Sequence, residues 1–258
     1  MPEATPEKDE ELAEGTLLSH LAELRNRLFK VLLSVFVIFV ALLPFAQTIF
    51  NVAAEPLINV VPGGQLIALS PVSPLTATIM LAFYIALFLA MPVILYQVWA
   101  FVAPGLYKKE RHFALPLLAS SIVLFYAGIA FAYFVVFPLI FGFVSSFTPD
   151  KVEYQPDMAE YVSFIMMVVL VFGLAFETPI ATVLTVWTGL TTPKKLAKAR
   201  PYVFLGAFVV GMLLTPPDVI SQTILAIPVY LLFELGIIMS RLFPAKPGED
   251  AGEATNSV

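Results

Sequence analysis

The chain has 258 residues, of which 59% are hydrophobic and only 13% are charged. A soluble domain of this size needs far more polar surface, so the composition indicates a polytopic membrane protein. The formal net charge of −5 arises at the two acidic ends of the chain, and the remainder is slightly basic. The sequence has no cysteine, which excludes disulfides, and its two histidines lie far apart. We therefore predict no metal site and no cofactor.

The first sixteen residues are acidic, contain proline and have few large apolar side chains. Such a segment buries too little apolar surface to offset its ordering entropy, so we predict disordered tails at 1–16 and 244–258. Residues 17–28 differ, because leucines recur there at helical spacing with Glu23, Arg25 and Arg27 between them. This pattern predicts a short amphipathic helix at the membrane interface, and a membrane domain that covers 17–243.

Six apolar segments follow, and each is a candidate membrane-spanning helix. Pro92 predicts a kink in the second segment, because proline removes one helical hydrogen bond. The fifth segment has about 14 residues, which cover roughly 21 Å of a hydrocarbon core roughly 30 Å thick. Pro216 and Pro217 then enforce a turn, so we expect a short hairpin of the fifth and sixth helices that thins the bilayer. The segments are 28–46, 75–98, 113–137, 161–187, 202–215 and a last one that ends near Phe233.

The positions of the basic residues predict the orientation. If the N-terminus is cytoplasmic, thirteen of the fourteen Lys and Arg residues lie on that side and only Lys151 lies outside. Such a bias predicts six helices with both chain ends inside, and outer loops at 47–74 and 138–160. The sequence shows no internal repeat and no Gly-rich helix break of the kind found in many secondary transporters.

One carboxylate, that of Glu177, lies well inside the fourth apolar segment. An ionisable group at that depth costs on the order of 3 kcal/mol or more, so Glu177 should face protein or water rather than lipid. Two interpretations remain open: a protonated or hydrogen-bonded Glu that packs helices together, and a contact or proton-linked site used in transport. The second makes a proton-coupled secondary transporter or channel the alternative function.

Acidic residues are rare on the predicted cytoplasmic face. Outside the tails, this face carries eleven bases but only three acids, Glu23, Glu110 and Glu234. A basic ligand would be held only at these carboxylates, and a guanidinium suits them best because it binds bidentately. The alternatives are an i,i+4 pair of Glu23 with Arg27, worth about 0.3 to 0.5 kcal/mol, and a solvated Glu110 between basic neighbours.

Motifs of enzymes are not found in the sequence. There is no G-x-x-x-x-G-K-[ST] phosphate loop, and Glu177 alone does not supply the residues of an intramembrane protease. The bases are spread over short loops as the topology demands, so they do not predict nucleic-acid binding. We predict that the chain is not an enzyme.

Four segments resemble TatC, the receptor subunit of the twin-arginine (Tat) protein translocase. They are 20–25 (HLAELR), 92–101 (PVILYQVWAF), 106–111 (LYKKER) and 211–218 (GMLLTPPD). The resemblance covers about 17–243 in order, and both tails fall outside it. It implies a concave bundle of six helices in the bacterial inner membrane, which binds signal peptides of folded proteins for export.

The resemblance also implies the roles of particular residues. Glu23 and Glu110 match the acids that receive the twin arginines of a signal peptide on the cytoplasmic face. The residues that flank them in the same motifs are Arg25, Arg27, Phe101, Tyr107 and Arg111. The candidate polar positions for a partner or within the membrane are Glu177, Tyr133, Asp218 and Gln222, and the candidate structural prolines are Pro56, Pro216 and Pro217.

The partners implied by the resemblance are the TatA and TatB subunits, whose helices are expected near the fifth and sixth segments and Glu177. Several copies of the chain are expected in one complex, embedded in the lipid bilayer. Energy is expected to come from the proton-motive force, because nucleotide-binding motifs are not found.

Overall fold

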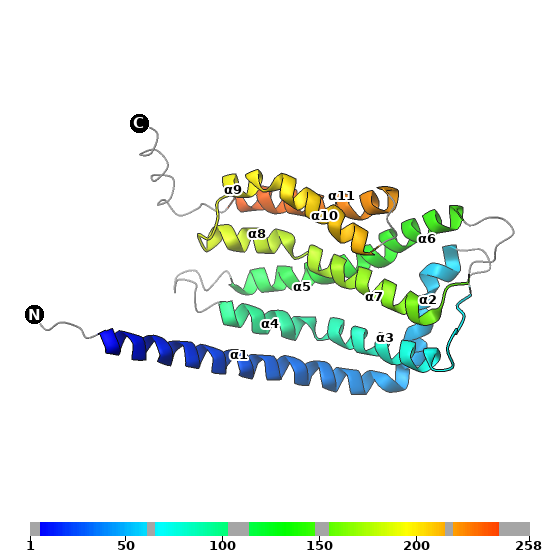
Figure 1. The fold of residues 1–258 in the computed structure, drawn as a ribbon, viewed down its shortest axis with the longest axis horizontal. Coiled ribbons are helices and arrows are strands. Elements are labelled where there is room, and N and C mark those ends of the chain that lie inside the picture. The colour runs from blue at the N-terminus through cyan, green and yellow to red at the C-terminus, as the bar shows by residue number, and fades with distance from the viewer. Residues whose placement is uncertain (1–5, 61–64, 103–113, 148–154, 215–218, 243–258) are drawn as a thin grey trace, which may run out of the picture.

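The computed structural model describes residues 6–60, 65–102, 114–147, 155–214 and 219–242 (Figure 1). Within these ranges the regular elements are helices, and the one β pairing is an isolated bridge between Ile67 and Asp157. This confirms the predicted all-helical class. The expected C-terminal tail lies outside the described residues. In chain order the helices are α1 (Pro6–Leu42), η1 (Leu43–Phe45), α2 (Ala46–Val60), α3 (Ser73–Leu89), α4 (Met91–Val102), α5 (Ala114–Phe131), η4 (Ala132–Val136), α6 (Phe137–Ser146), α7 (Met158–Ala175), α8 (Thr178–Trp187), α9 (Pro193–Lys198), α10 (Arg200–Leu214) and α11 (Val219–Ser240).

Helix α1 is longer than the sequence predicts. It joins the expected interfacial helix and the first apolar segment into one helix of 37 residues. It also begins at Pro6, inside the segment that we expected to be a disordered tail. Proline suits the first turn of a helix, and the Glu, Ala and Leu residues that follow favour helix, which accounts for the difference. Exposed side chains such as Phe29 and Phe36 are those of a helix whose outer face meets lipid.

The segment 47–74, which we expected to be a loop, contains helix α2. This helix follows η1 and crosses the end of the bundle away from the N-terminus (Figure 1). Ile49, Ala53 and Leu57 recur at a spacing of four and pack on the hydrophobic core, so one face of α2 is held against the bundle. The apolar stripe within the expected loop was the signal for this helix.

Helices α3 and α4 meet at an angle of 47°. The break falls at Ala90, two residues before Pro92, whose missing N–H interrupts the helical hydrogen bonds. The predicted kink in the second apolar segment is confirmed.

The third helical run, which comprises α5, η4 and α6, extends over 32 residues from Leu115 to Ser146. We expected it to end at Phe137 and an outer loop to begin at Pro138, and this was wrong. Pro138 lies in the first turn of α6, where a missing N–H is tolerated, and the preceding η4 is a π-helical segment that absorbs the local change in backbone pairing.

The fourth apolar segment is divided at Phe176 and Glu177, between α7 and α8. We expected one continuous helix here. Pro179 stands in the first turn of α8 and cannot donate to the carbonyl of Ala175, the last residue of α7. The carboxylate of Glu177 is therefore carried by a helix break rather than by a regular turn of helix.

The last two spanning segments differ in length. Helix α10 has 15 residues and covers about 22 Å, which confirms the short fifth helix. Helix α11 has 22 residues and covers about 33 Å, so the expectation of an equally short sixth helix ending near Phe233 was wrong. Glu234 lies within this helix, and Arg200 and Tyr230 hydrogen-bond its carboxylate.

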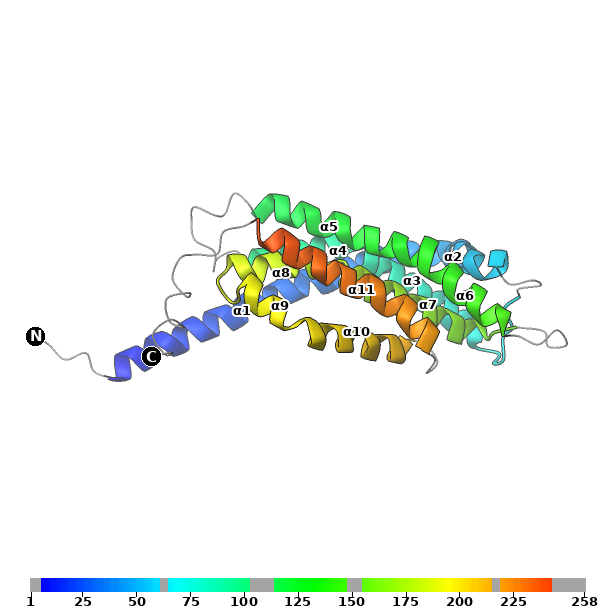
Figure 2. The ribbon, with the colours of Figure 1, turned by 90° about the horizontal axis from the view of Figure 1, so that it is seen from above.

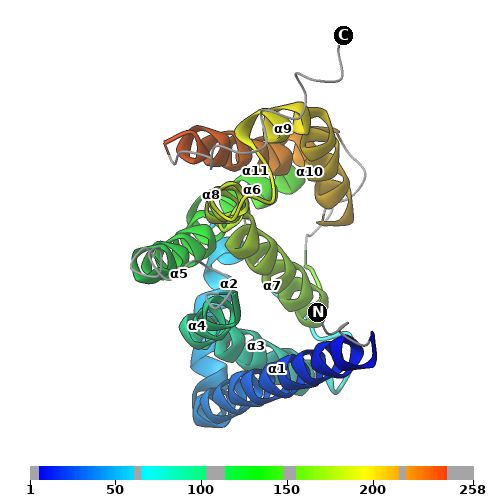
Figure 3. The same cartoon turned by 90° about the vertical axis from the view of Figure 1, so that its left-hand side faces the viewer.

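Four described helical runs are long and apolar enough to cross a membrane, and the bent α3–α4 pair makes a fifth. Viewed from one end, α7 lies between α1 with α3 and α4 on one side and α8 to α11 on the other (Figure 3). From above, α5 and α10 lie at opposite edges of the bundle (Figure 2). The four runs are Leu21–Ile58, Leu115–Ser146, Met158–Trp187 and Gln222–Ser240.

The core lies where α3, α5, α6 and α7 pack together. Helices α5 and α7 approach backbone to backbone, since a Cβ atom on Gly128 would lie 2.5 Å from the carbonyl oxygen of Phe172. Only glycine fits there, and this close contact fixes which side chains of the two helices meet. The large side chains that are fully buried in this region include Leu81, Phe125, Phe137, Ile165 and Phe172.

Candidate functional site

The first polar cluster joins α1 to the last turns of α4 through Arg27. Its guanidinium donates to Glu23 Oε1 from Nε at 3.0 Å and from Nη2 at 2.5 Å. It also donates to Gln97 Oε1 at 3.2 Å and to the carbonyl oxygen of Ala100 at 3.1 Å. The i,i+4 pair of Glu23 with Arg27, one of the two sequence interpretations, is therefore formed. Arg27 also ties α1 to α4 through Gln97 and Ala100, and this contact was not predicted.

Glu23 is still accessible in this arrangement. Its side chain is 38% exposed, against 21% for Arg27, and both hydrogen bonds from Arg27 end on the same carboxylate oxygen, Oε1. Arg25 is exposed on a different side of α1, because residues two apart on a helix do not face each other. Phe101 is half-buried near the end of α4.

Three sequence-predicted residues of the same site, Tyr107, Glu110 and Arg111, lie outside the described residues. The segment that carries them, 103–113, connects α4 to α5. The end of α4 and the start of α5 lie at the end of the bundle that the N-terminal part of α1 also reaches (Figure 1). Glu23 and the described end of α4 therefore lie at the same end of the bundle.

The second polar cluster is formed by Glu177 and Ser121. The Ser121 hydroxyl, which is only 1% exposed on α5, donates to Oε2 of Glu177 at the α7–α8 break. The other carboxylate oxygen, Oε1, is buried and has no hydrogen-bond partner among the described residues. Glu177 thus has capacity for one more hydrogen bond inside the bundle. Ser121 was missed, because a serine in an apolar run carries no pattern that points to a residue 56 positions away.

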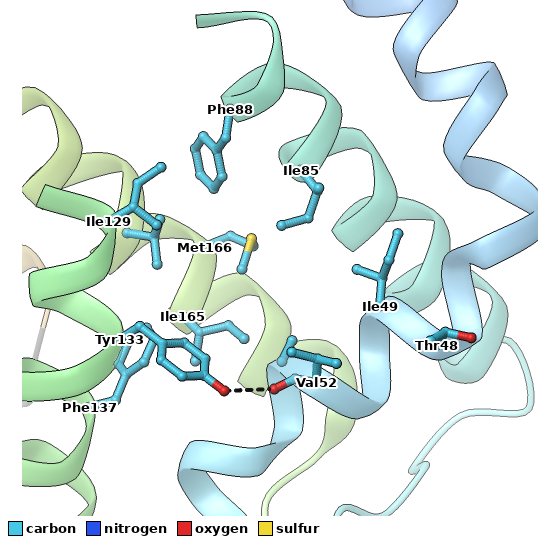
Figure 4. Close-up of a pocket in the computed structure, with 12 residues that line it drawn as sticks. Thr48, Ile49, Val52, Ile85, Phe88, Ile129, Tyr133, Phe137, Ile165 and Met166 are labelled. Carbon is cyan, nitrogen blue, oxygen red and sulfur yellow. Dashed lines mark hydrogen bonds between the residues drawn. The ribbon is translucent and has the colours of Figure 1, made fainter. Parts of the chain in front are cut away.

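The third cluster links Tyr133 to Pro56, two residues that the sequence analysis placed in different groups. Proline has no N–H, so Pro56 leaves the carbonyl oxygen of Val52, four residues earlier, without its usual helical donor. The hydroxyl of Tyr133 donates to this oxygen at 3.1 Å and lies 3.5 Å from Glu55 Oε2 (Figure 4). Tyr133 therefore replaces the helical hydrogen bond that Pro56 cannot make.

Tyr161 makes a similar contact one residue further along α2. Its hydroxyl donates to the carbonyl oxygen of Ala53 at 2.8 Å, and its ring stacks on Phe141 with centroids 5.7 Å apart. Two tyrosines from the third and fourth helical runs thus hold α2 across the end of the bundle.

Asp157 fixes the connection that leads into α7. Its carboxylate accepts from the backbone N–H groups of Ala159 and Glu160 as an N-cap, and from that of Leu69 at 3.0 Å. These hydrogen bonds, of which that from Leu69 contributes most, lower the pKa of Asp157 below its ordinary value. Asp157 falls in the segment 138–160 that we expected to be a loop, although an Asp directly before an apolar helix is a recognised N-cap signal.

A further ion pair holds α10 to α11. Arg200 donates to both carboxylate oxygens of Glu234, at 2.7 and 2.8 Å, and Tyr230 donates to Oε1 at 2.9 Å. Of the candidate residues in this hairpin, Gln222 is half-buried on α11, and its backbone lies close to Gly211 of α10. Pro216, Pro217 and Asp218 lie outside the described residues.

No group of three or more His, Cys, Asp or Glu side chains that could hold a metal ion occurs in the part of the chain that the structure describes. The polar groups within the bundle instead work through pairwise hydrogen bonds at helix breaks and helix ends. The fold and these clusters define a helical protein with several apolar spans, the class of multi-pass membrane proteins whose buried polar groups pair between helices.

Comparison with known proteins identifies the particular family. Residues 19–228 match the family model described as Sec-independent protein translocase protein (TatC). The chain is 54% identical over 231 residues to the Sec-independent protein translocase protein TatC of Escherichia coli (strain K12), which covers 89% of this chain and 90% of that protein. It is 37% identical over 235 residues to that of Aquifex aeolicus (strain VF5), which covers 90% of this chain and 98% of that protein. The chain belongs to the TatC family.

The fold agrees with this assignment. A crystal structure of the Twin Arginine Translocase Receptor TatC matches with a TM-score of 0.79 and 38% sequence identity, and the match covers 86% of this chain and 98% of that one. As a TatC-family translocase component with several apolar spanning helices, the chain is a multi-pass protein of the bacterial inner membrane.

Proposed function

We propose that this chain is the receptor of a twin-arginine translocase, which binds Arg-Arg signal peptides on the cytoplasmic face and recruits TatA for export of folded proteins. The observation that carries the proposal is the family match over residues 19–228, which includes Glu23 and Glu110. The chain itself is not an enzyme in this proposal. Its energy source is the proton-motive force, of which one elementary charge crossing 100 mV supplies about 2.3 kcal/mol.

The contacts of Glu23 support a guanidinium-binding role. This carboxylate already accepts two hydrogen bonds from the Arg27 guanidinium, at 2.5 and 3.0 Å. A guanidinium of the signal peptide has the same donors, so it can bind the remaining oxygen or displace Arg27. Arg27 would keep Gln97 and Ala100 as acceptors after such an exchange. We assign Glu110 the same role toward the second arginine, with Tyr107 and Arg111 beside it.

The topology that we propose has six crossings, with both chain ends in the cytoplasm. The five candidate spans together with α10 make six, and the distribution of Lys and Arg supports the orientation. Helix α10, which covers about 22 Å, is shorter than the roughly 30 Å core, so we expect local thinning of the bilayer beside it.

We propose Glu177 as the contact site for a partner helix or the inserted signal peptide. Its buried Oε1 has no partner among the described residues, and an incoming hydrogen-bond donor would satisfy it. Asp218 and Gln222 are proposed to act in the same contact from the α10–α11 side. TatA and TatB are the proposed partners, in a complex that holds several copies of this chain.

The decisive experiment is binding of the membrane-embedded protein to a signal peptide with Arg-Arg and to the same peptide with Lys-Lys. Glu23→Gln and Glu110→Gln should each weaken Arg-Arg binding about tenfold, as expected when a charge-assisted hydrogen bond is lost. Glu160→Gln, at an exposed acid on the proposed outer side, is the matched control and should change nothing. Equal binding of the two peptides by the unmodified protein would refute the capture site.

A further inference from the structure

A cavity of about 360 Å³ lies between α2, α3, α7 and the α5–η4–α6 run (Figure 4). Tyr133 and Val52 of the third polar cluster form part of its wall, but no role described above uses the space itself. Its lining is almost wholly apolar, and includes Ile49, Val52, Ile85, Ile129, Ile165 and Val169.

The cavity offers no polar group to a ligand from its walls. Tyr133 and Thr48 are the only lining residues with polar side chains. The hydroxyl of Tyr133 already donates to the carbonyl oxygen of Val52, and Thr48 is exposed on α2 (Figure 4). A sugar, nucleotide or peptide backbone would lose hydrogen bonds to water on entry, so the ligand must be apolar where it enters.

The size of the cavity selects among apolar ligands. An apolar cavity of about 150 Å³ holds the six carbons of benzene, so 360 Å³ provides room for about 14 carbon atoms. A helix about 10 Å in diameter occupies about 420 Å³ per turn, so not even one turn of a partner helix or signal peptide fits. A single hydrocarbon chain fits, and the bilayer around the protein supplies such chains.

The charge at one end of the cavity selects among lipids. Glu55, an exposed residue of α2, places Oε2 within 3.5 Å of the Tyr133 hydroxyl. It is the only charged residue in the sequence of α2, η4 and α6. A carboxylate there repels an anionic head group and attracts an ammonium group.

We propose that this cavity binds one acyl chain of a phospholipid whose head group carries a primary ammonium, and that the ammonium lies beside Glu55. Such a lipid would fill the space between α2 and the bundle, and would support α2 together with the two tyrosine hydrogen bonds.

The test uses the full chain in nanodiscs with phosphatidylethanolamine that carries a photoreactive diazirine in the middle of one acyl chain. Crosslinked residues are mapped by mass spectrometry. We expect labels to concentrate on Ile129, Met166 and Val169, which line the cavity, rather than on exposed α5 residues such as Val123. Labels spread evenly over the lipid-facing helices would overturn the proposal.

Two variants fill the cavity from its half-buried walls, Ile85→Trp on α3 and Ile129→Trp on α5. Each should remove most of the labelling on α7, whereas Val123→Trp on the exposed face of α5 should leave it intact. The use of two walls makes misfolding of one variant harmless to the test. Unchanged labelling of α7 in both filled variants would refute binding in the cavity.

The head group is tested with the same photoreactive chain on phosphatidylglycerol. We expect the ethanolamine lipid to label the cavity about two- to fivefold more strongly, and Glu55→Gln to remove this preference, as for an exposed ion pair. Equal labelling by the two lipids would overturn the assignment of the ammonium to Glu55. If a twin-arginine signal peptide suppresses the lipid label, the cavity belongs to the peptide's path and the lipid proposal fails.

Discussion

Tyr133→Phe should destabilise the protein, because it removes a hydrogen bond that forms only because Pro56 lies in α2. The Tyr133 hydroxyl donates at 3.1 Å to the carbonyl oxygen of Val52, which is the oxygen that residue 56 would pair with if it had an N–H group. Phenylalanine keeps the ring contacts with Phe134 and Phe137, so the change removes little except the hydroxyl.

The expected loss of unfolding free energy depends on whether the carbonyl oxygen of Val52 has another hydrogen-bond donor. A net hydrogen bond contributes about 1 kcal/mol, and hydrogen bonds measured in membrane proteins average about 0.6 kcal/mol. In the unmodified chain Tyr133→Phe should therefore cost about 0.6 to 1 kcal/mol. In a Pro56→Ala background the new N–H can donate to Val52, so the same change should cost close to zero.

A double-mutant cycle measures this difference directly. Unfolding free energies of the four proteins, obtained by titration with denaturing detergent, should give a coupling energy of about 0.6 to 1 kcal/mol between the two positions. Tyr126→Phe, which removes a hydroxyl bonded to the Phe88 carbonyl on α3, is a matched control whose cost should not depend on residue 56. If Tyr133→Phe costs the same with Pro56 and with Ala at that position, the explanation given for the pair is wrong.

Three further predictions concern the other clusters. Asp157 has a lowered pKa, so its contribution to stability is present above the ordinary pKa of about 4 and is lost as the pH falls through its folded-state pKa. When the melting temperature is measured against pH, Asp157→Asn should therefore flatten the fall at acid pH. Ser121→Ala should lower TatA crosslinking about tenfold, and Glu177→Ala should also lower it, whereas Ser121→Thr should largely retain it. Crosslinking that is identical in these three variants would contradict the role of Ser121. Arg27→Lys should cost about 1 kcal/mol in unfolding free energy, because a lysine cannot reach three acceptors as a guanidinium does, and equal melting temperatures for Arg27→Lys and the exposed Arg25→Lys would argue against it.

The local features of the fold could be predicted where a residue type acts on its own backbone. Pro92 bends the second apolar segment wherever the surrounding helices lie, and a length of 15 residues makes α10 short in any packing. The same reasoning failed at Pro138 and Pro179. One was expected to start a loop and lies within a continuous helical run, and the other divides a segment that was expected to be continuous.

For a similar reason, some residues of the candidate site could be predicted from the sequence and others could not. Glu23 and Glu177 could be chosen because a lone carboxylate on a basic face or in an apolar segment has a large electrostatic consequence. Gln97 and Ser121 could not be chosen, because a neutral polar side chain has little consequence until its partner is known.

The sequence by itself determined that this chain is a helical membrane protein of the TatC family, because hydropathy, charge bias and short motifs depend on local composition. Only the tertiary structure decided which polar atoms of different helices meet. Ser121 reaches Glu177 across 56 residues and Tyr133 reaches Val52 across 81, and such pairs depend on how helices cross. That crossing is set by close contacts such as Gly128 against Phe172, where the absence of a side chain lets two backbones touch.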